Sequence, residues 1–170
     1  MNAAHLHLIV NHLPIVGSLL ALPLLLLTLW RRQRAMLDAS VVLLVLAALG
    51  GGAAWLSGGE AEEIVEDLPG IREATIEEHE EIAEVGGVLM IVAGAVGVGA
   101  WFMTRRKDGP VPLLAAAAPL VVTAVASVAL GLAGQSGGQI RHPEAYEAST
   151  GPVGAFGEAE EDEAHERNER

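Results

Sequence analysis

Four long apolar stretches, separated by shorter polar segments, dominate the pattern of hydrophobic and polar positions along this chain. The central part of each stretch carries no charged residue, and each is close to the roughly 17–25 residues that a helix needs to cross a membrane. Buried helices of a soluble protein are a poor alternative, because four such stretches in 170 residues leave no polar face to meet water. We therefore predict four membrane-spanning helices, at about residues 8–30, 37–57, 76–103 and 111–134.

Small residues gather within these predicted spans, in runs such as Gly50–Gly52 and Ala115–Ala118. In lipid, small residues let helix backbones approach closely, and this close packing holds membrane helices together. We therefore predict an all-α, integral membrane four-helix bundle with up-down-up-down topology, built from residues 1–147. An outer loop at residues 58–75 and a disordered acidic tail at residues 148–170 complete the predicted organisation.

The positive charges predict how the bundle is oriented. Six of the ten Lys and Arg residues lie in the short segments that follow the first and third spans. With four spans both segments fall on one side of the membrane, and the positive-inside rule makes that side cytoplasmic. Both termini and the acidic loop then face the periplasm or exterior, which predicts a multi-pass protein of a bacterial inner membrane. The six cations are Arg31, Arg32, Arg34, Arg105, Arg106 and Lys107.

The composition excludes several kinds of function. A net charge of −12 at pH 7 argues against nucleic-acid binding, because the phosphate backbone would repel the protein. The absence of Cys excludes a disulfide scaffold, a Cys-ligated zinc or iron–sulfur site and a c-type haem attachment. The chain has no P-loop or dinucleotide fingerprint. The sequence therefore gives no sign of an independent catalytic activity.

The histidines are the most informative polar residues. None of the six lies in a predicted cytoplasmic segment, and five lie near the outer ends of three different spans. On a regular helix, His7 and His12 point about 140° apart. The sixth histidine, His165, is in the acidic tail and is expected to be solvated. The five candidates at the outer boundary are His5, His7, His12, His79 and His142.

Three interpretations of this cluster remain open. The first is a haem b held by imidazoles from two helices, such as His12 and His79, with Arg141 pairing with a propionate. The second is a Cu, Zn or Fe ion bound by histidines and carboxylates, which the acidic loop favours. In the third, the histidines only hydrogen-bond the loops to the helix ends. The haem-site candidates are His7, His12, His79, His142 and Arg141, and the ion-site candidates are His5, His7, His12, His79 and His142.

From His7 onward, the sequence HLIVNHLP resembles the opening motif of an uncharacterised family of bacterial four-helix membrane proteins, His-Pro-x-x-Val-His-Phe-Pro-Ile-Ala. His7 and His12 match the two histidines of the motif, and Pro14-Ile15 matches its Pro-Ile. The histidine at position 79 and the pair Gly137-Gly138 are also similar to the family. The resemblance implies a haem- or metal-associated membrane module in a respiratory or electron-transfer setting, near cytochrome c-type domains. Departures from the motif are Leu8, Asn11 and Val16.

We therefore expect an outward-facing, His-rich site for haem b or a metal, in a protein that transfers electrons or serves as an accessory subunit of a respiratory-type complex. Its expected partners are the lipid bilayer and cytochrome or respiratory-complex proteins. The alternative is a cofactor-free structural subunit of a membrane complex. A transporter is disfavoured, because transport paths place ionisable groups near the membrane midplane and the centres of the four spans contain none.

Overall fold

The computed structural model describes residues 2–150, which form helices and short connections without any β-strand. Met1 and residues 151–170, which include His165 and most of the predicted acidic tail, lie outside the described residues. The last helix reaches Thr150. The helices are α1 (Ala3–Val10), α2 (His12–Arg31), α3 (Arg34–Val65), α4 (Glu73–Thr104), α5 (Leu113–Arg141) and α6 (Pro143–Thr150).

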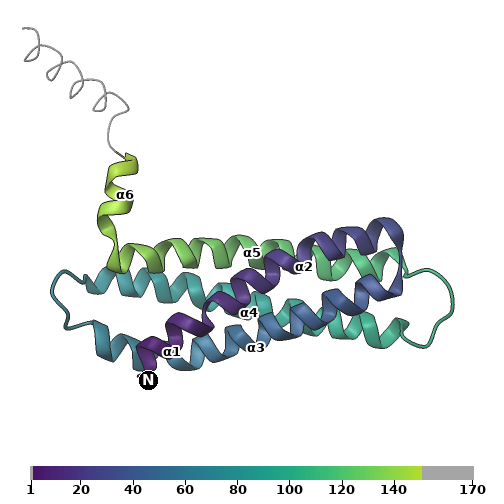
Figure 1. The fold of residues 1–170 in the computed structure, drawn as a ribbon, viewed down its shortest axis with the longest axis horizontal. Coiled ribbons are helices and arrows are strands. Elements are labelled where there is room, and N and C mark those ends of the chain that lie inside the picture. The colour runs from purple at the N-terminus through teal and green to yellow at the C-terminus, as the bar shows by residue number, and fades with distance from the viewer. Residues whose placement is uncertain (1, 151–170) are drawn as a thin grey trace, which may run out of the picture.

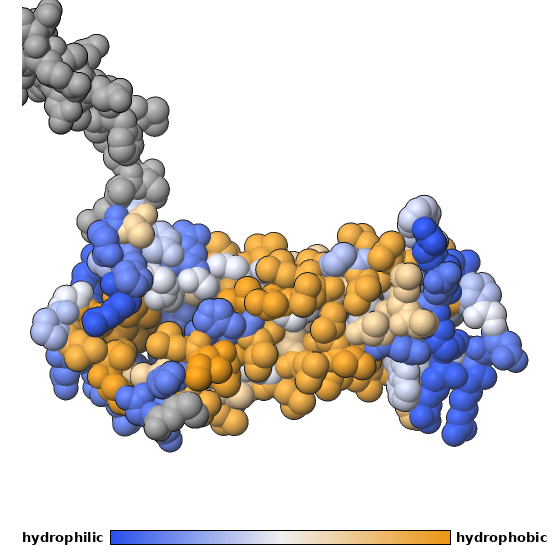
Figure 2. All heavy atoms as spheres, viewed as in Figure 1, coloured by the Kyte–Doolittle hydropathy of each residue, from blue (hydrophilic) through white to orange (hydrophobic). Residues whose placement is uncertain are grey.

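Four helical segments are long and apolar enough to cross a membrane. α1 and α2 are separated only by Asn11 and act as one segment of 29 residues, while α3 and α4 have 32 residues each and α5 has 29. At 1.5 Å per residue, each segment exceeds a hydrocarbon layer of about 30 Å. Figure 2 shows the consequence as a hydrophobic band between two hydrophilic ends. By length and composition, the described chain is a multi-pass membrane bundle, as the sequence predicted.

The helices run up and down in one elongated bundle (Figure 1). Each of α2 to α5 packs against the next along the chain, and α5 also packs against α2, so the bundle closes; α1 lies across α3. One end contains α1, the α3–α4 connection and the α5–α6 junction, and we call it the histidine end. The other contains residues 31–34 and 105–112, and we call it the basic end.

Two helices extend further than the sequence predicted. α3 continues to Val65 and α4 begins at Glu73, so the predicted loop of residues 58–75 is reduced to residues 66–72. Glu and Ala are strong helix formers. Beyond the hydrocarbon layer, water solvates the polar side chains on every face of a helix, so a polar sequence can continue the helix. Gly70 makes the turn with a φ of 86°, in the left-handed region that glycine adopts most easily.

Glycines set the closest approaches between neighbouring helices. Gly50 of α3 faces α2 so closely that an added Cβ atom would overlap with the Cβ of Leu13. Gly97 of α4 lies against α3, where an added Cβ would be 2.8 Å from Cδ1 of Leu44. The small residues therefore bring backbones together, as expected for helices that associate in lipid.

Candidate functional site

Two of the candidate histidines meet at the histidine end of the bundle. His7 is on α1 and His79 is on α4, and their ring centroids are 6.5 Å apart with the ring planes at 85°. Both residues are half-buried. The fold thus brings together two imidazoles that are far apart in the sequence.

The backbone of α3 anchors the His7 ring. The Nδ1–H group of His7 donates to the carbonyl oxygen of Ala54 at 3.0 Å, and the hydroxyl oxygen of Ser57 lies 3.3 Å from the same nitrogen. Ser57 is buried, and its hydroxyl donates to the carbonyl oxygens of Ala53 at 2.9 Å and Ala54 at 3.1 Å. A rigid helix, rather than a mobile side chain, therefore fixes the orientation of the His7 ring.

The backbone of α5 anchors the His79 ring in the same way. The Nδ1–H group of His79 donates to the carbonyl oxygen of Ala133 at 3.0 Å, and the hydroxyl oxygen of Ser136 lies 3.2 Å from that nitrogen. Ser136 is buried, and its hydroxyl donates to the Ala133 carbonyl at 3.1 Å. The two rings are therefore held by equivalent contacts from two different helices.

These contacts determine which ring nitrogen carries the hydrogen. A carbonyl oxygen only accepts hydrogen bonds, so Nδ1 is the donor in both rings. In a neutral imidazole, a proton on Nδ1 leaves the lone pair of Nε2 available. Metal-ligating histidines usually donate their other N–H to a backbone carbonyl or carboxylate, which orients the ring and raises its basicity. Both rings thus have the hydrogen-bonding arrangement of a metal ligand.

The two anchors share one short sequence. Residues 54–59 and residues 133–138 both read Ala-x-x-Ser-Gly-Gly, and in each copy the Ala carbonyl and the Ser hydroxyl contact one histidine. One half of the site therefore comes from α1 and α3, and the other half from α4 and α5. The repeated motif is the sequence signal for residues that the histidine pattern alone does not indicate, namely Ala54, Ser57, Ala133 and Ser136.

We expect Gly137→Ala to disturb the site more than Gly58→Ala. A Cβ at position 137 would lie 3.0 Å from Cε1 and 3.2 Å from Nδ1 of His79, whereas a Cβ at position 58 meets only Cε1 of His7, at 3.9 Å. The His79 ring must move to accommodate the methyl group. The affinity for a metal or haem should fall about 10–100-fold in Gly137→Ala, the range for loss of an orienting contact, and about threefold or less in Gly58→Ala. Titration of the two purified variants measures both values, and equal affinities would contradict this difference between the two half-sites.

Two other candidate histidines of the first segment do not join the pair. His5 is exposed near the start of α1. His12 is also exposed, and its Nδ1–H group donates to the Leu8 carbonyl oxygen at 2.8 Å. Because His7 faces α3, His12 points away from it, as the angle of about 140° between them on a helix requires. The partner of His79 in the structure is therefore His7, rather than the His12 that the sequence favoured.

The candidates after α5 are also exposed. The ring of His142 contacts Glu144, with Nδ1 and Oε1 3.1 Å apart, and 68% of the His142 side chain is exposed. The Glu144 carboxylate accepts hydrogen bonds from its own backbone N–H and from His142, and these bonds lower its pKa. Arg141, the last residue of α5, is at the histidine end and forms no ion pair within the described chain.

A bare-ion site is not assembled in the described part of the chain. No group of three or more His, Asp or Glu side chains is placed to hold a metal ion among the described residues. Structural zinc sites use four protein ligands and catalytic sites usually three. The pair of His7 and His79 therefore provides two of the ligands that a metal site requires.

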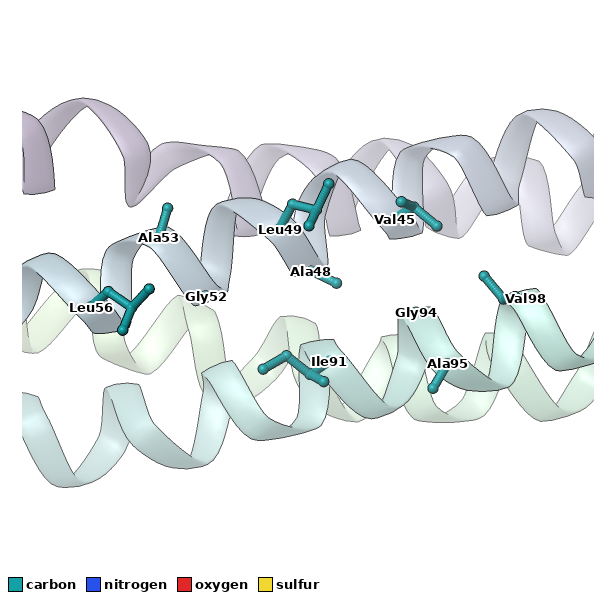
Figure 3. A pocket seen from close by; sticks show the side chains of 10 residues that line it. All are labelled: Val45, Ala48, Leu49, Gly52, Ala53, Leu56, Ile91, Gly94, Ala95 and Val98. Carbon is teal, nitrogen blue, oxygen red and sulfur yellow. The ribbon is translucent and has the colours of Figure 1, made fainter.

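An open groove of about 590 Å³ lies between α3 and α4 on the outer surface of the bundle (Figure 3). Gly52 and Gly94 leave space between side chains such as Leu49, Leu56 and Ile91. The lining is almost wholly apolar and includes no ionisable side chain. The groove therefore suits hydrocarbon chains, and the histidine pair remains the candidate functional site.

Comparison with known proteins finds no protein-family model, no curated protein and no solved structure that matches this chain.

Proposed function

We propose that this chain is a bacterial inner-membrane protein that binds one haem b between His7 and His79 and transfers electrons, as a carrier or as an accessory subunit of a respiratory-type complex. The observation that carries the proposal is the pair itself: two imidazoles from different halves of the bundle, each with Nδ1–H donated to a helix carbonyl. Cofactor sites in helical bundles are built in this way, from side chains on facing helices.

The ring separation is compatible with a metal between the two imidazoles. Metal–imidazole bonds are about 2 Å long, so two rings must lie close together to bind one metal. The centroids of His7 and His79 are 6.5 Å apart. His7 and His79 would hold the haem iron, and the bound haem would supply reversible one-electron chemistry.

Each neighbouring group has a defined role in this proposal. The carbonyl groups of Ala54 and Ala133 keep the proton on Nδ1 and orient both rings. Arg141 is exposed at the same end and carries a guanidinium group that suits a propionate, because its forked donors match a carboxylate. A Cu, Zn or Fe ion needs further donors, which the exposed His5, His12 and His142 do not provide in the described arrangement.

The absorption spectrum and metal content of the purified protein test the proposal. The protein is extracted from membranes of cells supplied with haem precursor, and bound haem and metals are quantified. We expect one haem per chain, with the spectrum of an iron ligated by two imidazoles. A stoichiometric metal without a haem spectrum would show that the site binds a bare ion instead of haem. The absence of both would overturn the proposal in favour of a cofactor-free structural subunit.

The proposed orientation places the histidine end outside the cytoplasm, because the basic end carries six cations. The chain contains no Cys, so single cysteines report accessibility without background. We expect Asp67→Cys, in the α3–α4 connection, to react with a membrane-impermeant maleimide on intact spheroplasts. We expect Asp108→Cys, in the α4–α5 connection, to react only after lysis. The reverse pattern would contradict the proposed orientation.

A further inference from the structure

The basic end of the bundle is assembled from two loops that hydrogen bonds lock together. The backbone N–H of Val111 donates to the carbonyl oxygen of Arg32 at 2.9 Å, and Nε of Arg32 donates to the carbonyl oxygen of Val111 at 2.8 Å. Nη2 of Arg34 donates to the Lys107 carbonyl oxygen at 2.8 Å. Arg32 also adopts a φ of 54°, in the left-handed region that non-glycine residues rarely occupy. These bonds hold residues 31–34 against residues 107–111 at this end of the bundle.

The cations of this surface lack acidic partners. Within the described chain, the ion pair between His142 and Glu144 is at the other end of the bundle. The carboxylates in the sequence near the basic end are Asp38 and Asp108, and neither forms an ion pair within the described residues. Arg32 and Arg34 each donate a side-chain hydrogen bond to a backbone carbonyl oxygen. The side chains without a hydrogen bond or ion pair in the described chain are Arg31, Arg105, Arg106 and Lys107.

Two of these free arginines are stacked on aromatic rings. The guanidinium carbon of Arg31 lies 4.4 Å from the ring centroid of Trp30. That of Arg105 lies 4.3 Å from the Phe102 centroid and 5.1 Å from the Trp101 centroid. Trp30 is 71% exposed and Phe102 is 62% exposed, so both rings face the surroundings. Cation–π contacts therefore hold the two guanidinium groups beside exposed apolar rings.

This arrangement points to a ligand that is both anionic and apolar. In Figure 2 the hydrophilic surface of the basic end borders the hydrophobic band directly. Tryptophan rings are typical of the boundary between membrane and water, and the forked donors of arginine match phosphate oxygens. A soluble phosphate would use the charges but leave the exposed rings uncovered, whereas a phospholipid uses both.

We propose that the basic end is a binding surface for anionic phospholipid headgroups, with Arg31 after Trp30 of α2 and Arg105 after α4 each contacting a separate headgroup phosphate. The two arginines come from different loops, and the Arg32–Val111 bonds fix those loops relative to each other. The histidine end contains the Glu-rich segments on both sides of the α3–α4 connection, which repel anionic lipids. We therefore expect only the basic end to select these lipids. This proposal does not depend on haem binding.

Lipid selectivity of the full-length protein tests this assignment. The protein is reconstituted in phosphatidylcholine vesicles that contain a minor fraction of phosphatidylglycerol, and native mass spectrometry identifies the lipids retained after mild extraction. We expect phosphatidylglycerol to be enriched about tenfold over the vesicle composition, as two arginines near a membrane surface allow. The double variant Arg31→Gln/Arg105→Gln should retain the two lipids in nearly the vesicle ratio.

The matched control is Arg106→Gln/Lys107→Gln, which removes the same charge from unstacked side chains and should keep most of the enrichment. Helix content from circular dichroism confirms that both double variants are folded. No enrichment in the unmodified protein, or an equal loss in both double variants, would overturn the proposal. Displacement of the lipid by millimolar inorganic phosphate would also overturn it, because the surface would then recognise phosphate alone.

Discussion

Replacing either His7 or His79 with alanine is expected to reduce bound haem at least about tenfold, because each variant loses one of the two proposed protein ligands and the effect exceeds that of losing an orienting contact. Removing both should cost little more than removing one, since both imidazoles are proposed to bind the same metal. Haem content per chain and the absorption spectrum of the purified variants measure the loss. The site geometry predicts this result for two residues that are far apart in the sequence.

Matched controls separate ligation from general destabilisation. His5→Ala, His12→Ala and His142→Ala change exposed histidines outside the pair and should leave haem content unchanged. His79→Met replaces one ligand with a thioether, which ligates haem iron and raises its reduction potential. This variant should therefore keep haem and shift its potential upward. A full haem content in His79→Ala, or an equal loss in His12→Ala, would contradict the proposed ligands.

The second large effect is expected at Gly50, where Ala should destabilise the bundle although alanine is the better helix former. An added Cβ would overlap with Leu13 Cβ and would lie 3.3 Å from Cδ of Pro14. Overpacking of this kind costs about 1–3 kcal/mol, against a gain in helix propensity of about 0.5–1 kcal/mol. The midpoint of thermal unfolding in detergent should fall by several degrees, since about 1 kcal/mol corresponds to about 2–4 °C for this chain length.

The two following glycines provide matched controls on the same helix. A Cβ at Gly51 has Pro14 Cβ as its nearest neighbour at 3.7 Å, and a Cβ at Gly52 has no neighbour within 4 Å. Gly51→Ala and Gly52→Ala should therefore be neutral or slightly stabilising. Leu13 and Pro14 come only a few residues after the end of α1 in the sequence. A shift of these residues in Gly50→Ala should therefore also displace His7 of α1 and weaken haem binding. Equal unfolding midpoints for the three variants would show that the α2–α3 contact does not limit stability.

The membrane helices were predictable because the hydrocarbon layer imposes a simple requirement on each one separately. A chain segment that crosses it must be long, uncharged and internally hydrogen-bonded, and all of these properties are local. The ends of the helices were predicted less accurately, since residues 58–65 have the polar composition of a loop but continue α3. Outside the hydrocarbon layer both states are solvated, so hydropathy no longer separates helix from loop.

The candidate site was predictable only as a set of histidines at one end of the bundle. The angle between His7 and His12 already indicates that one helix face takes at most one of them. It does not indicate which one, because that choice depends on the rotation of α1 against α3. The contact between His7 and the Ala54 carbonyl settles the rotation and leaves His12 exposed. The repeated Ala-x-x-Ser-Gly-Gly motif is visible in the sequence, but its role as an anchor for imidazoles is visible only in three dimensions.

By itself, the sequence determined the four helices, their alternating directions and the unequal charges of the two ends. Each of these follows from how individual residues partition between water and hydrocarbon. The tertiary structure alone decided that His7 and His79 form the pair, that helix carbonyls hold both rings, and that Gly50 rather than Gly52 cannot be enlarged. These features depend on helix rotation and separation, which many small packing contacts set together, and no single stretch of the chain contains that information.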